Sequence, residues 1–520
     1  MNRSVLQVLL ALLIQAFSAS GMTTTEVSAV LTQAISRAQQ IEPRAVIAVV
    51  DREGFVLGVW SVDSAPDANA VQDAITKAGT AAFLSSDQNA FTSRTAGSIV
   101  QQHFPPGILN RPNGPLVGVN FSNLSFTDVN RFKNPNAGYV ADFTSGTNGA
   151  PIAGPAPLSG LAGSPGGVPL FLAGKLIGGV GVAGQTRAPI SSPFSALADI
   201  QIQQRYDPDE DVALAGQIGF QPTASIRGSN VLIDGIRVPY VVGSTRLGAL
   251  LPLGAVGSSV SPYPIVNSPV VIYPTSPFGG QACEVRSPII ADPVGGLIAG
   301  QSRLTAAEVS TILSQASARA KITRAGIRLP RGKAAQTFIT VVNNPALPNT
   351  SPAILGTIRT PGATLFSWDV AVQKARTAVF FSDDTLAFSS RTVGYLAQQF
   401  FPPGIVNTAP GPFYRLQEQY SLLPTGVRNP LNNVTLTTAL SVPNPYVPNG
   451  ITIFPGGFPL YRNGVLIGAI GVSGDGIDQD DLIAAAGTVG FVAPLAIRAD
   501  QQQYQGARLP YAKFPRNPDL

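Results

Sequence analysis

A chain of 520 residues is too long for a single ordinary hydrophobic core, so at least two domains are expected. With 44% hydrophobic and 12% charged residues, the composition excludes an intrinsically disordered chain. The net charge of +5 is spread along the chain without runs of Lys or Arg, so it does not indicate a nucleic-acid partner. The single cysteine, Cys283, excludes an intramolecular disulfide and any cysteine-based metal centre, and we interpret it as a loop thiol.

The first 20 residues have the layout of a secretory signal peptide. One basic residue, Arg3, precedes an apolar run from Val5 to Phe17, and small residues follow. This run is shorter than the about 20 residues that a membrane-spanning helix needs. We therefore expect an exported protein, secreted or periplasmic, with no membrane span once the signal is removed.

The next blocks predict a helix, a hairpin and a second helix. Apolar residues recur with helical spacing over 25–41, and Thr23 with Glu26 forms a capping box at the start of this helix. AVIAVVDREGFVLGVWSV (45–62) contains two β-rich runs around a polar turn, which predicts a hairpin. AITKAGTAAFLSSDQNAFTSRT (74–95) is helical in pattern.

A third helix, a second hairpin and a last helix follow. SRTAGSIVQQHFPPGI (93–108) predicts a helix that continues to the prolines, because proline lacks the amide hydrogen that a helix needs. GGVPLFLAGKLIGGVGVAG (166–184) reads as a hairpin that turns at Ala173-Gly174. The acidic residues of DPDEDVALAG (207–216) fit the first turn of a helix, where the dipole favours them, better than a calcium site.

These blocks occur twice in the same order, which indicates a duplicated domain. The second set lies at 307–322, 371–392, 390–405, 456–474 and 478–487. Mixed helices and hairpins predict an α+β fold, with two tandem copies of an antiparallel-sheet domain flanked by helices. The expected segments are a signal peptide (1–20), copy one (23–245) with a long insertion (109–165), a Pro/Gly/Ser-rich linker (246–299), copy two (300–505) with its insertion (406–454), and a tail (506–520).

Three motifs in this order carry a family resemblance. VVDREGFVLG is followed by KAGTA (KARTA in copy two), and then by GGFPLYRNGVLIGAIGVSG with an acidic helix start. The pattern resembles the GlcG/HbpS-like haem-binding domain family, over about 120 residues in each copy. The resemblance implies a profilin/PAS-like sandwich that tends to oligomerise and, in some members, binds haem.

His103 is the only histidine in the chain. On a helix it would share a face with Ala96, Ile99 and Val100, and in copy two we expect Phe400 to take its place in the core. One interpretation is a buried histidine bonded to a backbone carbonyl. The other is a metal ligand, with the imidazole as an axial ligand of haem iron.

Two lysines occupy equivalent positions in the copies, Lys77 and Lys374. As cofactor-binding residues they would face an anionic group such as a haem propionate. Alternatively, each covers a helix flank with its stem while its amine stays in water.

Two arginines are likewise equivalent, Arg94 and Arg391, each near the start of its helix. They could form an anion site for the cofactor. Alternatively, each forms a structural ion pair with an acid such as Asp87 or Asp384.

Two classes of function follow from the sequence. The first is an exported protein that binds haem or a related tetrapyrrole. The second is a ligand-free structural or assembly protein that uses the duplicated fold and its long loops for contacts between proteins, including copies of itself. The scarcity of His, Cys and Met favours the second class, while the resemblance favours the first. An enzyme is a weaker third possibility.

Overall fold

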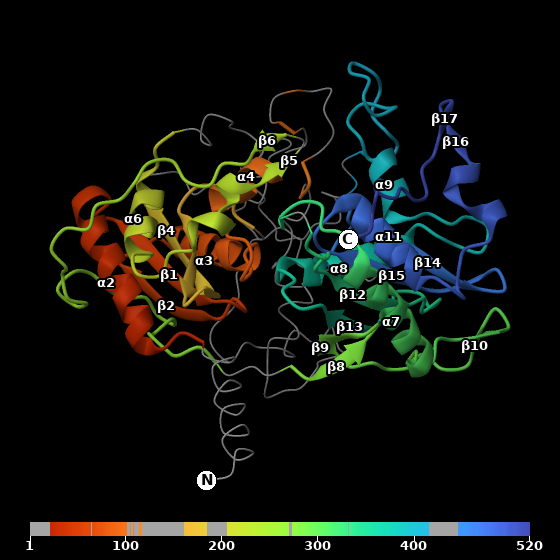
Figure 1. Cartoon of the computed structure of the whole chain (residues 1–520), viewed down its shortest axis with the longest axis horizontal. Coiled ribbons are helices and arrows are strands. Elements are labelled where there is room, and N and C mark those ends of the chain that lie inside the picture. Colours follow the sequence, from red (N-terminus) through yellow and green to blue (C-terminus); the bar gives the residue numbers. More distant parts are fainter. Residues whose placement is uncertain are drawn as a thin grey trace, which may run out of the picture.

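The computed structural model describes residues 21–63, 65–100, 104–105, 108, 114–116, 161–184, 205–233, 235–269, 273–330, 332–414, 416 and 446–520. Figure 1 shows two α/β units side by side, the first formed by the N-terminal half of the chain and the second by the C-terminal half. Each unit has the order helix, hairpin, helix, helix, hairpin, helix, which confirms the predicted α+β duplication.

Copy one places its helices around an antiparallel sheet with the strand order β3-β4-β1-β2-β7. The elements are α2 (Thr24–Ile41), β1 (Ala45–Asp51), β2 (Val56–Ser61), α3 (Ala68–Phe83), α4 (Ser93–Ile99), β3 (Gly167–Leu172), β4 (Lys175–Gly184), α6 (Pro208–Gly216), β5 (Leu232–Ile233), β6 (Ile236–Arg237) and β7 (Ser258–Ser259).

Copy two repeats this plan with the strand order β14-β15-β12-β13-β9-β8. The elements are β8 (Thr275–Phe278), β9 (Gln281–Ser287), β10 (Leu297–Ile298), β11 (Gln301–Ser302), α7 (Ala306–Ile322), β12 (Phe338–Asn343), β13 (Ile354–Arg359), α8 (Phe366–Phe380), α9 (Ser390–Leu396), β14 (Gly457–Arg462), β15 (Val465–Ser473), α11 (Ile477–Gly487), β16 (Gln503–Tyr504) and β17 (Ala507–Arg508).

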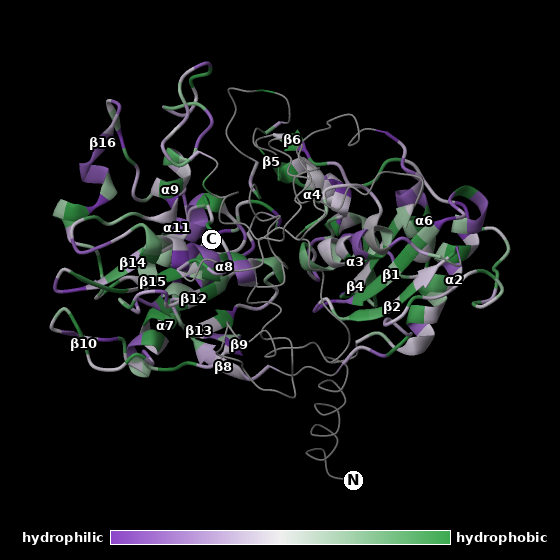
Figure 2. Ribbon diagram, turned by 180° about the vertical axis from the view of Figure 1, so that it is seen from behind, coloured by the Kyte–Doolittle hydropathy of each residue, from purple (hydrophilic) through white to green (hydrophobic). Residues whose placement is uncertain are grey.

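Both faces of the first sheet are covered, so its strands are apolar throughout. Val46, Ala48 and Val50 of β1 pack in the core cluster that contains α3, while Ile47 and Val49 pack with α2 and α6. This alternation follows from the two-residue period of a strand. Figure 2 shows the result as strongly hydrophobic β1, β2 and β4.

The third helix of each copy is shorter than the sequence suggested. We expected the helix to run to the prolines, but α4 ends at Ile99 and α9 ends at Leu396. In each copy, the carbonyl oxygen at the end of the helix accepts a hydrogen bond from a loop amide. The amide of Leu116 donates to the oxygen of Ile99 at 3.0 Å, and the amide of Phe413 donates to the oxygen of Leu396 at 3.1 Å. In copy two, the helical face on which Phe400 was expected therefore ends at Leu396.

The environment of the equivalent position in copy two also differs from the expectation. Phe400 is only half-buried, and the following residue, Phe401, is the one in the core, with 2% of its surface exposed. Phe104, which precedes the prolines in copy one, is likewise 2% exposed. His103 itself lies outside the described residues.

The stretch 246–299, expected to be a linker, supplies strands to both sheets. β7 pairs with β2 of copy one, and β9 pairs with β13 of copy two. Cys283 lies in β9 rather than in a loop, and its buried thiol contacts the hydroxyl of Ser317. Strand pairing at both ends thus ties this stretch to the two units.

The copies meet through a shared core and a buried ion pair. Trp368 of α8 belongs to the same apolar cluster as Val50 of β1. Beside it, Nη1 of Arg286 donates to Oε2 of Glu53 at 2.8 Å, and the guanidinium carbon lies 3.7 Å from the ring centroid of Tyr273. The carboxylate and the aromatic ring both attract the guanidinium, and these attractions offset the cost of removing it from water. None of the helices in the described part of the chain is long and apolar enough to cross a membrane.

Candidate functional site

Lys77, expected to reach water or a ligand, is buried on α3 and surrounded by acceptors. Its Nζ donates to the backbone oxygen of Val182 at 2.9 Å and lies 3.0 Å from Oδ2 of Asp209 and 3.1 Å from Oδ2 of Asp73. A lysine ammonium has three hydrogens to donate, and these contacts use all three. Only 3% of the side chain is exposed, so its amine does not stay in water.

Lys374 repeats most of this arrangement on α8. Its Nζ lies 2.7 Å from the backbone oxygen of Val472 and 2.7 Å from Oδ2 of Asp480. A third acceptor equivalent to Asp73 is missing, because the residue one turn earlier on α8 is Val370. Among the described residues, two acceptors therefore face three ammonium hydrogens.

The arginines form structural ion pairs, as one interpretation held, but with other partners than Asp87 and Asp384. Arg94 makes a bidentate pair with Glu210, with distances of 2.7 and 3.0 Å. In copy two, Arg391 contacts Asp481, and its Nη2 lies 2.6 Å from Oδ1 of Asp478.

Asp87 and Asp384 hold the hairpin strands instead. Asp87 accepts the amide of Leu176 at 2.9 Å, and Asp384 accepts the amide of Leu466 at 2.8 Å. Each acid therefore anchors the second strand of its hairpin and is not needed by the arginine.

Acidic residues near the start of the last helix of each copy pair with these lysines and arginines. On α6, Asp207 caps the helix, while Asp209 and Glu210 pair with Lys77 and Arg94. The expected capping role is therefore only part of their function. Sequence reasoning missed the pairing, although the signal was present: acids recur at equivalent positions in the two copies, as the bases do.

Burial changes the proton affinity of these groups. It raises the pKa of Asp209 to about 6 and that of Asp480 to about 6, and the neighbouring ammonium groups only partly oppose this effect. For Lys77, burial alone would lower the pKa, but Asp209 and Asp73 raise it above its ordinary value. Lys77 is therefore charged at neutral pH.

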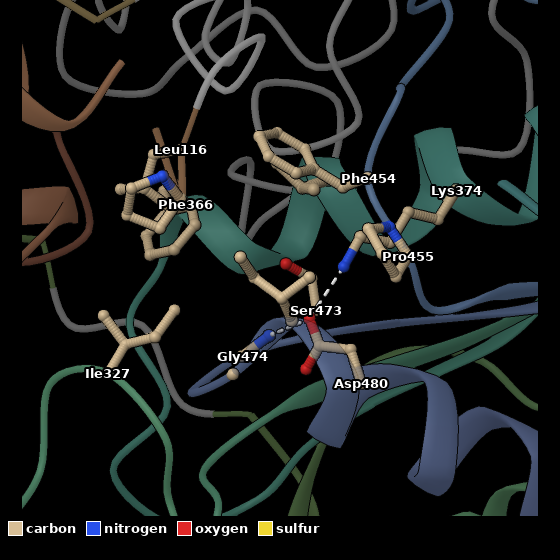
Figure 3. Close-up of a pocket in the computed structure, with 13 residues that line it drawn as sticks. Leu116, Ile327, Phe366, Lys374, Phe454, Pro455, Ser473, Gly474 and Asp480 are labelled. Carbon is tan, nitrogen blue, oxygen red and sulfur yellow. Dashed lines mark hydrogen bonds and ion pairs between the residues drawn. The ribbon is translucent and has the colours of Figure 1, made fainter. Parts of the chain in front are cut away.

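A small cavity of about 20 Å³ adjoins the Lys374–Asp480 pair. Figure 3 shows Leu116, Ile327 and Phe366 on the side opposite this pair. The remaining lining residues are Pro115, Val370, Phe454, Pro455, Ser473, Gly474, Gly476 and Ile477. Pro115 and Leu116 come from the insertion of copy one, so the two copies build the pocket together.

No cluster of three or more His, Cys, Asp or Glu residues suited to a metal ion occurs in the described part of the chain. Of the residues predicted to bind a cofactor, only Lys374 lines the pocket. Lys77, Arg94 and Arg391 lie in ion pairs, and His103 falls outside the described residues.

The model of the haem-degrading HbpS-like protein family matches residues 22–189 and 346–488. The match extends over more than half of the chain and includes both copies, so the chain belongs to the HbpS-like family. No curated protein matches the chain.

Solved structures similar to this chain match about one copy at a time. The haem complex of PduOC is 21% identical, with a TM-score of 0.24, and the match covers 36% of this chain and 96% of PduOC. Klebsiella pneumoniae protein ORFY is 19% identical (TM-score 0.23; 38% and 96% covered). HbpS from Streptomyces reticuli, as a double mutant, is 20% identical (TM-score 0.23; 39% and 96% covered).

Proposed function

We propose that this protein binds haem or a related tetrapyrrole, with the pocket between the two copies as its binding site. The observation that carries this proposal is the pocket itself, which sets an apolar wall against Lys374. Small-molecule sites typically combine such walls with a few polar groups. The family to which the chain belongs is described by haem degradation, which supports the choice of ligand.

The lining suits a carboxylate of a tetrapyrrole. Phe366, Val370 and Phe454 offer apolar surface, and Lys374 offers a donor to a carboxylate. The cavity of about 20 Å³ has room for a water-sized group, so it suits one carboxylate oxygen of the ligand and not the ring.

Iron coordination is not explained by these residues. Haem iron is ordinarily held by His, Cys, Met or Tyr, and the pocket-lining residues include none of these. A bound haem would bring redox chemistry, but this pocket supports only binding and orientation. His103 stays a proposal as the axial ligand.

Titrations with hemin and with metal-free protoporphyrin IX distinguish binding of the tetrapyrrole from coordination of its iron. We expect saturable binding of both, followed by the Soret band for hemin and by fluorescence for protoporphyrin IX. Failure of both to bind would refute tetrapyrrole binding. An unchanged Soret shift in His103→Ala would refute His103 as a ligand.

Export of the protein is part of this proposal and is supported by the signal-like residues 1–20. It predicts that the protein from cells lacks these residues, which N-terminal sequencing of the mature chain would test. Finding the intact N-terminus on a protein retained in the cytoplasm would contradict export.

A structural role is the second candidate, and the buried ion pairs favour it. Lys77, Arg94 and Arg391 are all engaged by acids of the same copy, as expected for residues that hold the fold. Assembly through the loops predicts a homo-oligomer, which light scattering would detect. A monomer that binds no tetrapyrrole would exclude both candidates.

A further inference from the structure

The two copies differ at the positions that line the pocket. Val370 and Phe454 of copy two correspond in the repeat to Asp73 and Ser164 of copy one. Both positions change from polar to apolar, while the lysine on the adjacent helical turn is kept. Copy one is therefore polar at these two positions.

The exchange of Asp73 for Val370 alters what the lysine can donate. In copy one, Oδ2 of Asp73 lies 3.1 Å from Nζ of Lys77 and takes its third hydrogen. In copy two, Val370 offers no acceptor, and Nζ of Lys374 has only Val472 and Asp480 among the described residues. A buried N–H group without a hydrogen-bond acceptor destabilises the folded protein, so an acceptor oxygen at this position would be favourable.

Lys374 itself lines the pocket, so a ligand can reach that donor. The amine is buried, with 3% of the side chain exposed, and the opposite wall is apolar. A hydrogen bond to a charged donor in such surroundings is stronger than one in water.

Building on the proposed function, we infer that only copy two holds the ligand, and that a carboxylate or carbonyl oxygen of the ligand accepts from Nζ of Lys374. Val370 permits this contact by leaving the third hydrogen of the ammonium available. The ligand class is one that carries such an oxygen on an extended arm, as a tetrapyrrole propionate does. In copy one, Lys77 has a structural role in its ion pairs with Asp73 and Asp209.

A reciprocal pair of variants tests the inference in the full chain. Val370→Asp places the carboxylate of copy one beside Lys374 and should weaken protoporphyrin IX binding by about tenfold to 100-fold, the value of a charged hydrogen bond. Asp73→Val is the matched control in copy one, and it should leave the Kd within about twofold. The wild type should bind one ligand per chain.

Val370→Thr protects the test against misfolding, because it introduces no charge and replaces one methyl of valine with a hydroxyl of similar size, which can accept a hydrogen bond. It should weaken binding by a smaller factor than Val370→Asp. Wild-type binding with an unchanged Kd in Val370→Asp, or with two ligands per chain, would overturn this inference. Lack of binding by the wild type would instead refute the proposed function.

Discussion

Nε of Arg94 lies 2.7 Å from Oε1 of Glu210, and both side chains are almost fully buried. The pair joins α4 to α6 across 116 residues of chain, and copy two repeats it with Arg391 and Asp481. A guanidinium withdrawn from water depends on its carboxylate. The recurring pair therefore secures the last helix of each copy.

Removal of the carboxylate should destabilise copy one strongly. Glu210→Ala removes the bidentate carboxylate from the buried guanidinium of Arg94, so we expect the free energy of unfolding to fall by about 3–5 kcal/mol in denaturant titrations. The control is Lys175→Ala, which breaks an exposed pair with Asp87 and should cost at most about 1 kcal/mol. Equal losses in the two variants would contradict a structural role for Arg94.

Close backbone contact explains the glycine at which β3 begins. A Cβ at Gly167 would collide with the backbone oxygen of Lys77, whereas a Cβ at Gly174 would meet no atom within 4 Å. Gly167→Ala should therefore lower the melting temperature far more than Gly174→Ala. The second change costs only about 1 kcal/mol, for the positive φ of its turn. A larger loss of melting temperature in Gly174→Ala than in Gly167→Ala would show that α3 does not pack closely against β3.

Protonation of Asp480 should make stability depend on pH in a defined direction. Its folded pKa is raised from 3.8 to about 6 by burial, so between these values the folded state retains a proton that the unfolded state has released. Stability from this group is thus present below about pH 4 and is lost as pH rises to about 6, by roughly 3 kcal/mol.

The measurement is the free energy of unfolding of the wild type minus that of Asp480→Asn, taken from pH 4 to pH 7. The asparagine does not titrate, so the difference isolates Asp480 from carboxylates whose pKa values are lowered, such as that of Glu284. We expect the difference to fall as pH rises. A constant or rising difference would show that the carboxyl group is not buried as described.

Local signals in the sequence predicted most of the fold. The capping box of Thr23 and Glu26 is present, and both residues of the Ala173-Gly174 turn have the positive φ that a tight hairpin needs. Each of these features depends on neighbouring residues, which is why it could be read from the sequence.

Long-range contacts could not be predicted in this way. The early end of α4 depends on Leu116, and β7 has only two residues, too few for a strand pattern. Glu210 and Asp209, which pair with Arg94 and Lys77, are more than 100 residues away from them. The pocket forms where the insertion of copy one contacts α8. No local sequence pattern predicts such a contact.

Hydrogen exchange with and without protoporphyrin IX tests the central claim most directly, because it locates the ligand. The account predicts slower exchange in α8 and at the junction of β15 with α11, where Lys374, Gly474 and Asp480 line the pocket. Exchange in α3, around Lys77, should stay unchanged. Protection confined to copy one, or equal protection of both copies, would contradict the assignment of the site to copy two.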